Sequence, residues 1–168
     1  MLFRSEGKAE LSRLSGISLK HIGVLPNGID TELYCPADLP TKVALRKQLG
    51  LPIEKLAVVI VARLAPEKNI GCLIRAFQQV VENIPAAELW IAGYGPEQRA
   101  LEDLTAQLQL RSHVRFLGKR SDVPQILRAA DLFALSSFSE GLSVALIEAA
   151  ACGLPIVATD VEIGRAHV

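Results

Sequence analysis

Runs of apolar residues alternate with amphipathic stretches along the chain. Several runs, such as AVVIVA and LFAL, are apolar at every position, which is typical of strands covered on both faces. The predicted strands are His21–Leu25, Ala57–Ala62, Glu88–Ala92, Val114–Leu117, Asp131–Leu135 and Pro155–Thr159. Helical three- and four-residue spacing is found in Thr41–Leu49, Ile70–Asn83, Pro96–Leu108, Val123–Ala130 and Ser143–Ala151. Repeated strand–helix–strand units require a parallel sheet, so we predict an α/β, Rossmann-like fold with helices on both faces.

Composition narrows the class of protein. A chain of 168 residues, half of them hydrophobic, supports one domain with a sizeable core. The 18 basic and 18 acidic residues cancel, so no overall field favours nucleic acid or an anionic membrane surface, and a phosphate ligand has to be held by a local site. Cys35, Cys72 and Cys152 are scattered and odd in number, which predicts reduced, mostly buried thiols of a cytoplasmic protein.

The two ends of the chain have the character of non-native sequence. Glu162–Val168 is encoded by GAGATCGGAAGAGCACACGTC and Leu2–Ser5 by CTCTTCCGATCT, and both strings resemble short-read sequencing adapters. We therefore expect native sequence over residues 6–161 only, with residues 1–5 and 162–168 non-native. The absence of a targeting signal then carries no information.

Ligands of open parallel sheets bind beyond the carboxyl ends of the strands, where most of the candidate residues fall. Arg63 and Lys68 follow the strand AVVIVA and offer a planar fork of donors and a mobile point charge for a diphosphate. Two solvated loop cations are an equally good interpretation. Gly93 and Gly95 form a turn that lets backbone pass close to a ligand, but such turns occur in most open α/β sheets.

The segment SSFSEGLSVALIEAAACGLPIVAT, residues 136–159, carries the most information. Glu140 precedes the predicted helix and Glu148 lies inside it among apolar residues, where an unpaired charge is costly. We interpret both as acceptors for sugar hydroxyls, Glu148 for those of a ribose. Backbone N–H groups near the helix start suit phosphates: Gly141, Leu142, Ser143 and Val144. The alternatives are a loop or cap acid for Glu140 and a solvated helix position for Glu148.

In order along residues 6–161, these motifs resemble the C-terminal, donor-binding domain of a family 4 glycosyltransferase with the GT-B fold. The resemblance rests on five segments: VLPNGIDTELYCP at 24–36, VARLAPEKNIGCLIRAF at 61–77, IAGYGPEQRAL at 91–101, VRFLGKRSDVPQILRAADLFALSS at 114–137, and EGLSVALIEAAACGLPIVATD at 140–160. Asn69 departs from it, because glycine is common there.

The resemblance implies retaining transfer of a glycosyl group, of the hexosyltransferase type, from a nucleotide-diphosphate sugar without a metal cofactor. It assigns Glu140 to the donor sugar, Glu148 to the ribose, Arg63 and Lys68 to the diphosphate, and the loop at Lys119 and Arg120 to the base. Backbone at Leu142–Val144 supports phosphates.

The resemblance also implies a parent protein with an N-terminal acceptor domain that is missing here. That parent is expected in the cytoplasm, with peripheral association at the cytosolic membrane face as an open alternative. We expect the fragment alone to bind a nucleotide weakly, without turnover. A non-catalytic Rossmann-like binding or interaction domain is the alternative function. A dinucleotide-dependent oxidoreductase is disfavoured because the third glycine of that fingerprint is missing.

Overall fold

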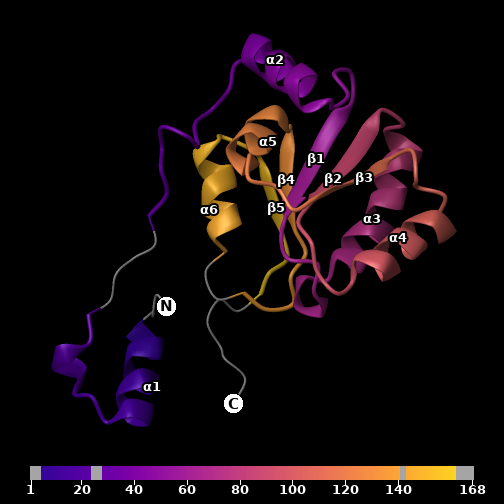
Figure 1. Cartoon of the computed structure of the whole chain (residues 1–168). Helices are drawn as coiled ribbons and strands as arrows, with labels where there is room; N and C mark the ends of the chain where they lie inside the picture. Colours follow the sequence, from indigo (N-terminus) through magenta and orange to yellow (C-terminus); the bar gives the residue numbers. More distant parts are fainter. Residues whose placement is uncertain (1–4, 24–27, 141–142, 162–168) are drawn as a thin grey trace.

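A five-stranded parallel sheet forms the centre of the computed structural model, which describes residues 5–23, 28–140 and 143–161 (Figure 1). The strand order is β3-β2-β1-β4-β5. The strands are β1 (Leu56–Val61), β2 (Ala87–Ala92), β3 (Val114–Gly118), β4 (Leu132–Leu135) and β5 (Ile156–Ala158). From β1 the chain builds outward first through β2 and β3 and then, on the other side, through β4 and β5. The predicted α/β, Rossmann-like fold is confirmed.

Helices cover both faces of the sheet (Figure 1). One face carries α3 (Ile70–Asn83) and α4 (Gln98–Gln107), and the other carries α2 (Leu39–Leu49), α5 (Val123–Ala129) and α6 (Val144–Ala151). The short 3₁₀ helix η2 (Pro66–Lys68) lies between β1 and α3. Near the start of the chain, α1 (Ser5–Ser15) and η1 (Leu19–His21) contact each other and lie apart from the sheet in Figure 1.

The side chains of β1 alternate between two hydrophobic cores, because successive residues of a strand point to opposite faces. Ala57 and Val59 belong to the core shared with Trp90, which α5 and α6 cover. Val58 and Ile60 belong to the core beneath α3 and α4. All four β1 residues are buried, which explains why this stretch of the sequence is apolar without interruption.

Two of the sequence predictions need correction. The predicted strand His21–Leu25 is wrong over its described residues, since residues 19–21 form η1 and residues 22–23 are in no strand, while Val24 and Leu25 lie outside the described residues. A strand is stable only beside another strand, and no described strand pairs with this segment. The thiols are all free, but Cys72 is exposed and Cys35 half-buried, so only Cys152 is buried as predicted.

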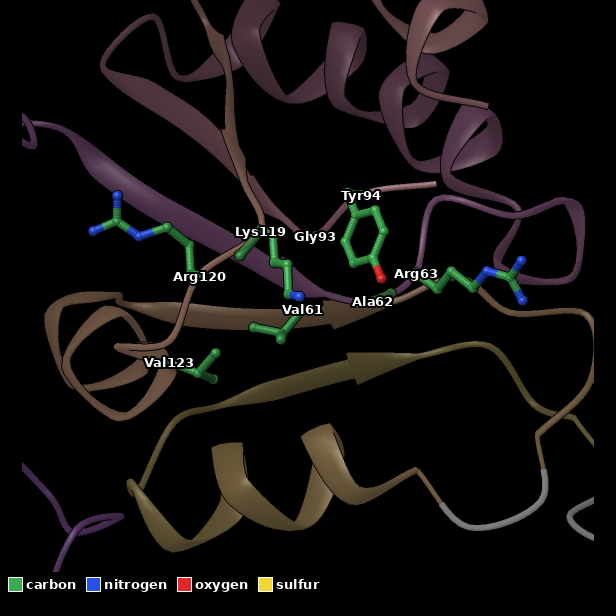
Figure 2. Close-up of a pocket in the computed structure, with 9 residues that line it drawn as sticks. Val61, Ala62, Arg63, Gly93, Tyr94, Lys119, Arg120 and Val123 are labelled. Carbon is green, nitrogen blue, oxygen red and sulfur yellow. The ribbon is translucent and has the colours of Figure 1, made fainter. Parts of the chain in front are cut away.

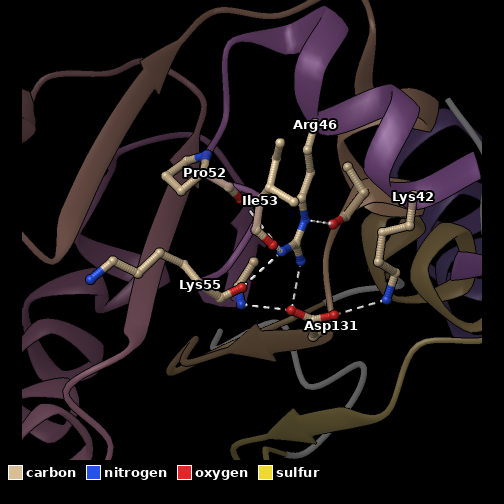
Figure 3. A network of polar contacts seen from close by, with 8 residues as sticks. Lys42, Arg46, Pro52, Ile53, Lys55 and Asp131 are labelled. Atoms are coloured by element: carbon tan, nitrogen blue, oxygen red, sulfur yellow. Dashed lines mark hydrogen bonds and ion pairs between the residues drawn. The ribbon is translucent and has the colours of Figure 1, made fainter. Parts of the chain in front are cut away.

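A partly buried polar network joins α2 to the amino-terminal edge of the sheet (Figure 3). At its centre is Arg46, whose guanidinium lies 5.4 Å from the centroid of the Trp90 ring. The guanidinium donates to one carboxylate and four backbone carbonyls, those of Asp131, Ala129, Pro52, Ile53 and Lys55. Because this network lies at the opposite end of the strands from the predicted site, we assign it to stability.

Candidate functional site

A cavity of about 370 Å³ opens at the carboxyl ends of β1, β2 and β3 (Figure 2). Residues from these strand ends, from the loops after them and from the start of α5 line it: Val61, Ala62, Arg63, Ala92, Gly93, Tyr94, Lys119, Arg120 and Val123. Four of them, Arg63, Gly93, Lys119 and Arg120, were predicted as site residues. The cavity therefore lies at the edge where open parallel sheets bind their ligands.

Two glycines let the loop after β2 pack against the loop after β1. Gly93 has φ +149°, and a Cβ on it would lie 1.8 Å from the carbonyl oxygen of Ala62. A Cβ on Gly95 would lie 2.3 Å from the carbonyl oxygen of Leu64. A hydrogen bond of 3.0 Å from the Leu64 N–H to the Tyr94 carbonyl ties the loops together. The two glycines therefore allow these loops to pack closely, and the packed loops build one wall of the cavity. The close approach of this turn to a ligand stays a prediction.

The three cations around the cavity have different surroundings. The Lys119 ammonium lies 5.4 Å from the centroid of the Tyr94 ring, and Figure 2 shows these two side chains facing each other. Arg120 forms a two-point ion pair with Asp122, with distances of 2.7 and 2.6 Å, and this hydrogen bonding lowers the pKa of the Asp122 carboxyl. Arg63 is exposed, extends away from Tyr94 in Figure 2, and has no ion-pair partner among the described residues.

A second cluster lies where the loop after β4 meets η2. The Lys68 ammonium is 2.6 Å from Oε1 of Glu140, and the Ser137 hydroxyl donates to the same oxygen at 2.5 Å. The Glu140 side chain is only 8% exposed, compared with 21% for that of Lys68. The structure therefore brings two predicted site residues, Lys68 and Glu140, into direct contact with each other, although neither lines the cavity.

Asn69, the residue after Lys68, stands where glycine is common in the family that the sequence resembles. Asn69 ends η2 and precedes α3 with φ 48° and ψ 38°, a left-handed conformation. Glycine adopts this conformation at little cost, and asparagine is one of the few other residues that adopt it routinely. The backbone of this turn thus explains both the usual glycine and the asparagine found here.

Only part of the predicted phosphate-binding segment can be placed. Gly141 and Leu142 lie outside the described residues. Ser143 is the N-cap of α6, and its hydroxyl accepts a hydrogen bond of 3.3 Å from the Leu146 N–H. Val144 is the first residue of the helix and is exposed.

Glu148 is half-buried on α6 and has a neighbour that sequence reasoning missed. This neighbour is Tyr34. The pKa of the Tyr34 phenol is raised well above its usual range, mainly by burial and also by a hydrogen bond to the Glu148 carboxylate and by the negative charge of that carboxylate. Tyr34 itself packs against the core beneath α5 and α6. Glu148 is not part of the cavity lining.

The sequence analysis also did not identify several residues that contact the predicted site residues. Tyr94 stands between Gly93 and Gly95, and Asp122 follows Arg120 by two residues, so a local pattern was available for both. Ser137 had no such signal, because a serine in a loop before an acid is common in sequences. Tyr34 is distant in sequence from Glu148, and only packing reveals their proximity.

Metal ligation and membrane insertion concern the part of the chain that the structure describes. No group of three or more His, Cys, Asp or Glu side chains there is arranged to hold a metal ion. None of the helices in that part has both the length and the apolar character needed to cross a membrane.

Comparison with known proteins places these features in a family. The family model described as glycosyl transferases group 1 matches residues 42–168. A relative in Escherichia coli, UDP-Gal:alpha-D-GlcNAc-diphosphoundecaprenol alpha-1,3-galactosyltransferase, is 35% identical over 147 residues. That match covers 83% of this chain and 37% of the relative, so the chain spans little more than a third of the length of that enzyme.

Solved structures match over nearly the whole chain. HepE from Anabaena, in complex with UDP and glucose, is 30% identical with a TM-score of 0.77, over 95% of this chain and 44% of that one. WaaG, a glycosyltransferase involved in lipopolysaccharide biosynthesis, is 25% identical with a TM-score of 0.80, over 99% of this chain and 45% of that one.

Proposed function

The chain belongs to the glycosyl transferases group 1 family, and from that premise we propose that it is the donor-binding domain of a retaining glycosyltransferase. Its donor is a sugar carried on a nucleoside diphosphate. The observation that carries the proposal is the cavity at the carboxyl edge of the sheet, which is lined by Arg63, Lys119 and Arg120. Asp122 offsets the charge of Arg120, so the excess positive charge comes from Arg63 and Lys119, and in a chain with no net charge it favours an anionic ligand.

Each part of the donor has a partner of suitable chemistry. The Tyr94 ring and the Lys119 ammonium offer a flat surface and a donor to the base. Arg63 has a charge that no described acid neutralises, which suits a diphosphate. Glu148, beside Tyr34, is an acceptor for ribose hydroxyls. Glu140 is an acceptor for hydroxyls of the transferred sugar.

Arg63 and Lys68 also have a role in the bond-breaking step. When the bond between the anomeric carbon and the phosphate oxygen breaks, negative charge grows on the departing diphosphate, and fixed cations stabilise it. These two side chains supply the positive charge, so the proposal requires no metal ion. Transfer itself belongs to the whole protein, with an acceptor site outside this domain and a cytoplasmic location, and the domain alone binds the donor without turning it over.

The test is calorimetric titration of the whole chain with UDP, GDP and ADP and with their sugar conjugates. We expect one nucleotide to bind and Arg63→Ala to weaken it about tenfold or more, the effect of a charge-assisted hydrogen bond. Arg99→Ala is the matched control, because it removes the same charge from an exposed position on α4 that does not line the cavity. A folded protein that binds no nucleotide overturns the proposal. Equal affinities in Arg63→Ala and wild type favour the non-catalytic alternative.

A further inference from the structure

Two donors of different character converge on one oxygen of Glu140. Lys68 Nζ and Ser137 Oγ lie 2.6 and 2.5 Å from Oε1. The other oxygen, Oε2, accepts no hydrogen bond from any described residue. A carboxylate held by one oxygen in this way keeps the lone pairs of its other oxygen for a ligand.

The loop that carries these groups is firmly joined to its neighbours. The Ser136 hydroxyl donates to the Lys68 carbonyl at 2.9 Å. The Phe138 N–H donates to the Glu67 carbonyl at 2.9 Å. From beyond β5, the Thr159 hydroxyl donates to the Ser137 carbonyl at 2.7 Å. The backbone of Ser137 is therefore supported from two sides, and a buried, supported hydroxyl is a well-defined donor.

We propose that Ser137 is a positioning residue, which holds Oε1 of Glu140 so that Oε2 faces the sugar of the donor. This inference rests on the proposed function and identifies what orients the sugar-binding acid. Ser137 is 1% exposed, so water does not compete for its hydroxyl. It touches Glu140 and not the donor, so it acts only through that carboxylate.

Lys68 alone is a poor anchor for this purpose. Its side chain is more exposed than that of Glu140 and carries the ammonium on a flexible stem, and the proposed function also assigns Lys68 to the diphosphate. When the ammonium turns toward a bound diphosphate, Oε1 loses its charged partner. The Ser137 hydroxyl stays in place, so its contribution is largest in the donor-bound state.

The experiment measures the sugar increment, defined as the ratio of Kd for a nucleotide to Kd for its sugar conjugate. Wild type, Ser137→Ala and Ser136→Ala are titrated with UDP and UDP-glucose, UDP and UDP-galactose, and GDP and GDP-mannose. We expect the sugar increment of the best pair to fall about tenfold in Ser137→Ala, with little change in Kd for the nucleotide alone. Ser136→Ala is the control, because it removes a neighbouring buried hydroxyl that bonds backbone instead of Glu140.

A purely structural role of Ser137 predicts a different result, namely equal weakening of nucleotide and conjugate. That result, or an unchanged sugar increment, overturns the inference while the proposed function stands. A wild type that binds nucleotides without any sugar increment also overturns it. Ser137→Thr keeps the hydroxyl and should retain the increment. If Ser137→Ala does not fold, Ser137→Cys supplies the comparison with wild type, because a thiol of similar size is a much weaker donor and should lower the increment. A folded wild type that binds no nucleotide refutes the proposed function itself.

Discussion

Replacement of Arg46 by methionine tests how the amino-terminal edge of the sheet is held together. The Arg46 side chain is 5% exposed and lies 2.6 Å from Asp131 Oδ2. Its guanidinium also donates at 2.8 Å to the carbonyls of Ala129, Ile53 and Lys55. Methionine retains an unbranched apolar side chain but no donor, so these acceptors lose a buried partner. We expect the free energy of unfolding to fall by about 3–5 kcal/mol, because the change removes a buried guanidinium together with its ion pair and its bonds to the carbonyls.

Lys42→Met is the matched control, since Lys42 is also on α2 and bonds the same carboxylate. Its ammonium is 2.8 Å from Asp131 Oδ1, but the side chain is 22% exposed. Water screens such a pair and solvates the carboxylate after the change, so we expect a loss of about 0–1 kcal/mol. Comparing the two variants therefore shows whether the loss in free energy of unfolding depends on burial of the side chain or only on the presence of an ion pair.

The assay is urea unfolding at neutral pH, followed by circular dichroism and by the fluorescence of Trp90, the single tryptophan, which is fully buried. Because Arg46 lies over the Trp90 ring, circular dichroism provides the independent probe. Equal losses in the two variants, or a loss below about 1 kcal/mol in Arg46→Met, would refute the reasoning.

Two further predictions concern the cavity wall and the buried thiol. Gly93→Ala places a methyl group 1.8 Å from the Ala62 carbonyl oxygen, so we expect a destabilisation of about 3 kcal/mol or more and loss of nucleotide binding in calorimetry. Gly23→Ala, with open space around it, is the control, and equal melting temperatures of the two variants would contradict the prediction. Burial raises the pKa of the Cys152 thiol from 9.0 to about 11, so the unfolded chain loses this proton first and stability falls as the pH rises above 9. Cys152→Ala lacks the thiol, so the urea midpoint should fall more in wild type than in the variant when the pH is raised from about 8 to about 10. An equal fall of the midpoint in the two proteins would argue against this prediction.

Local patterns in the sequence were sufficient for the sheet and its helices. The apolar run of β1 and the amphipathic spacing of α3 are properties of neighbouring residues, so they can be recognised without a partner. The prediction failed at residues 21–23, where a short apolar stretch has no described strand to pair with. A strand, unlike a helix, depends on residues far away in the chain.

The sequence by itself determined the family, the order of the elements, and the loops that carry the candidate site, because strand–loop–helix order dictates which loops share an edge of a parallel sheet. The contacts within that edge were decided only by the tertiary structure. Lys68 joins Glu140, Tyr34 approaches Glu148, and Arg46 joins Asp131 across long stretches of chain. A buried charge has to find a partner, but which partner it finds depends on how helices and loops pack, and no local pattern records that.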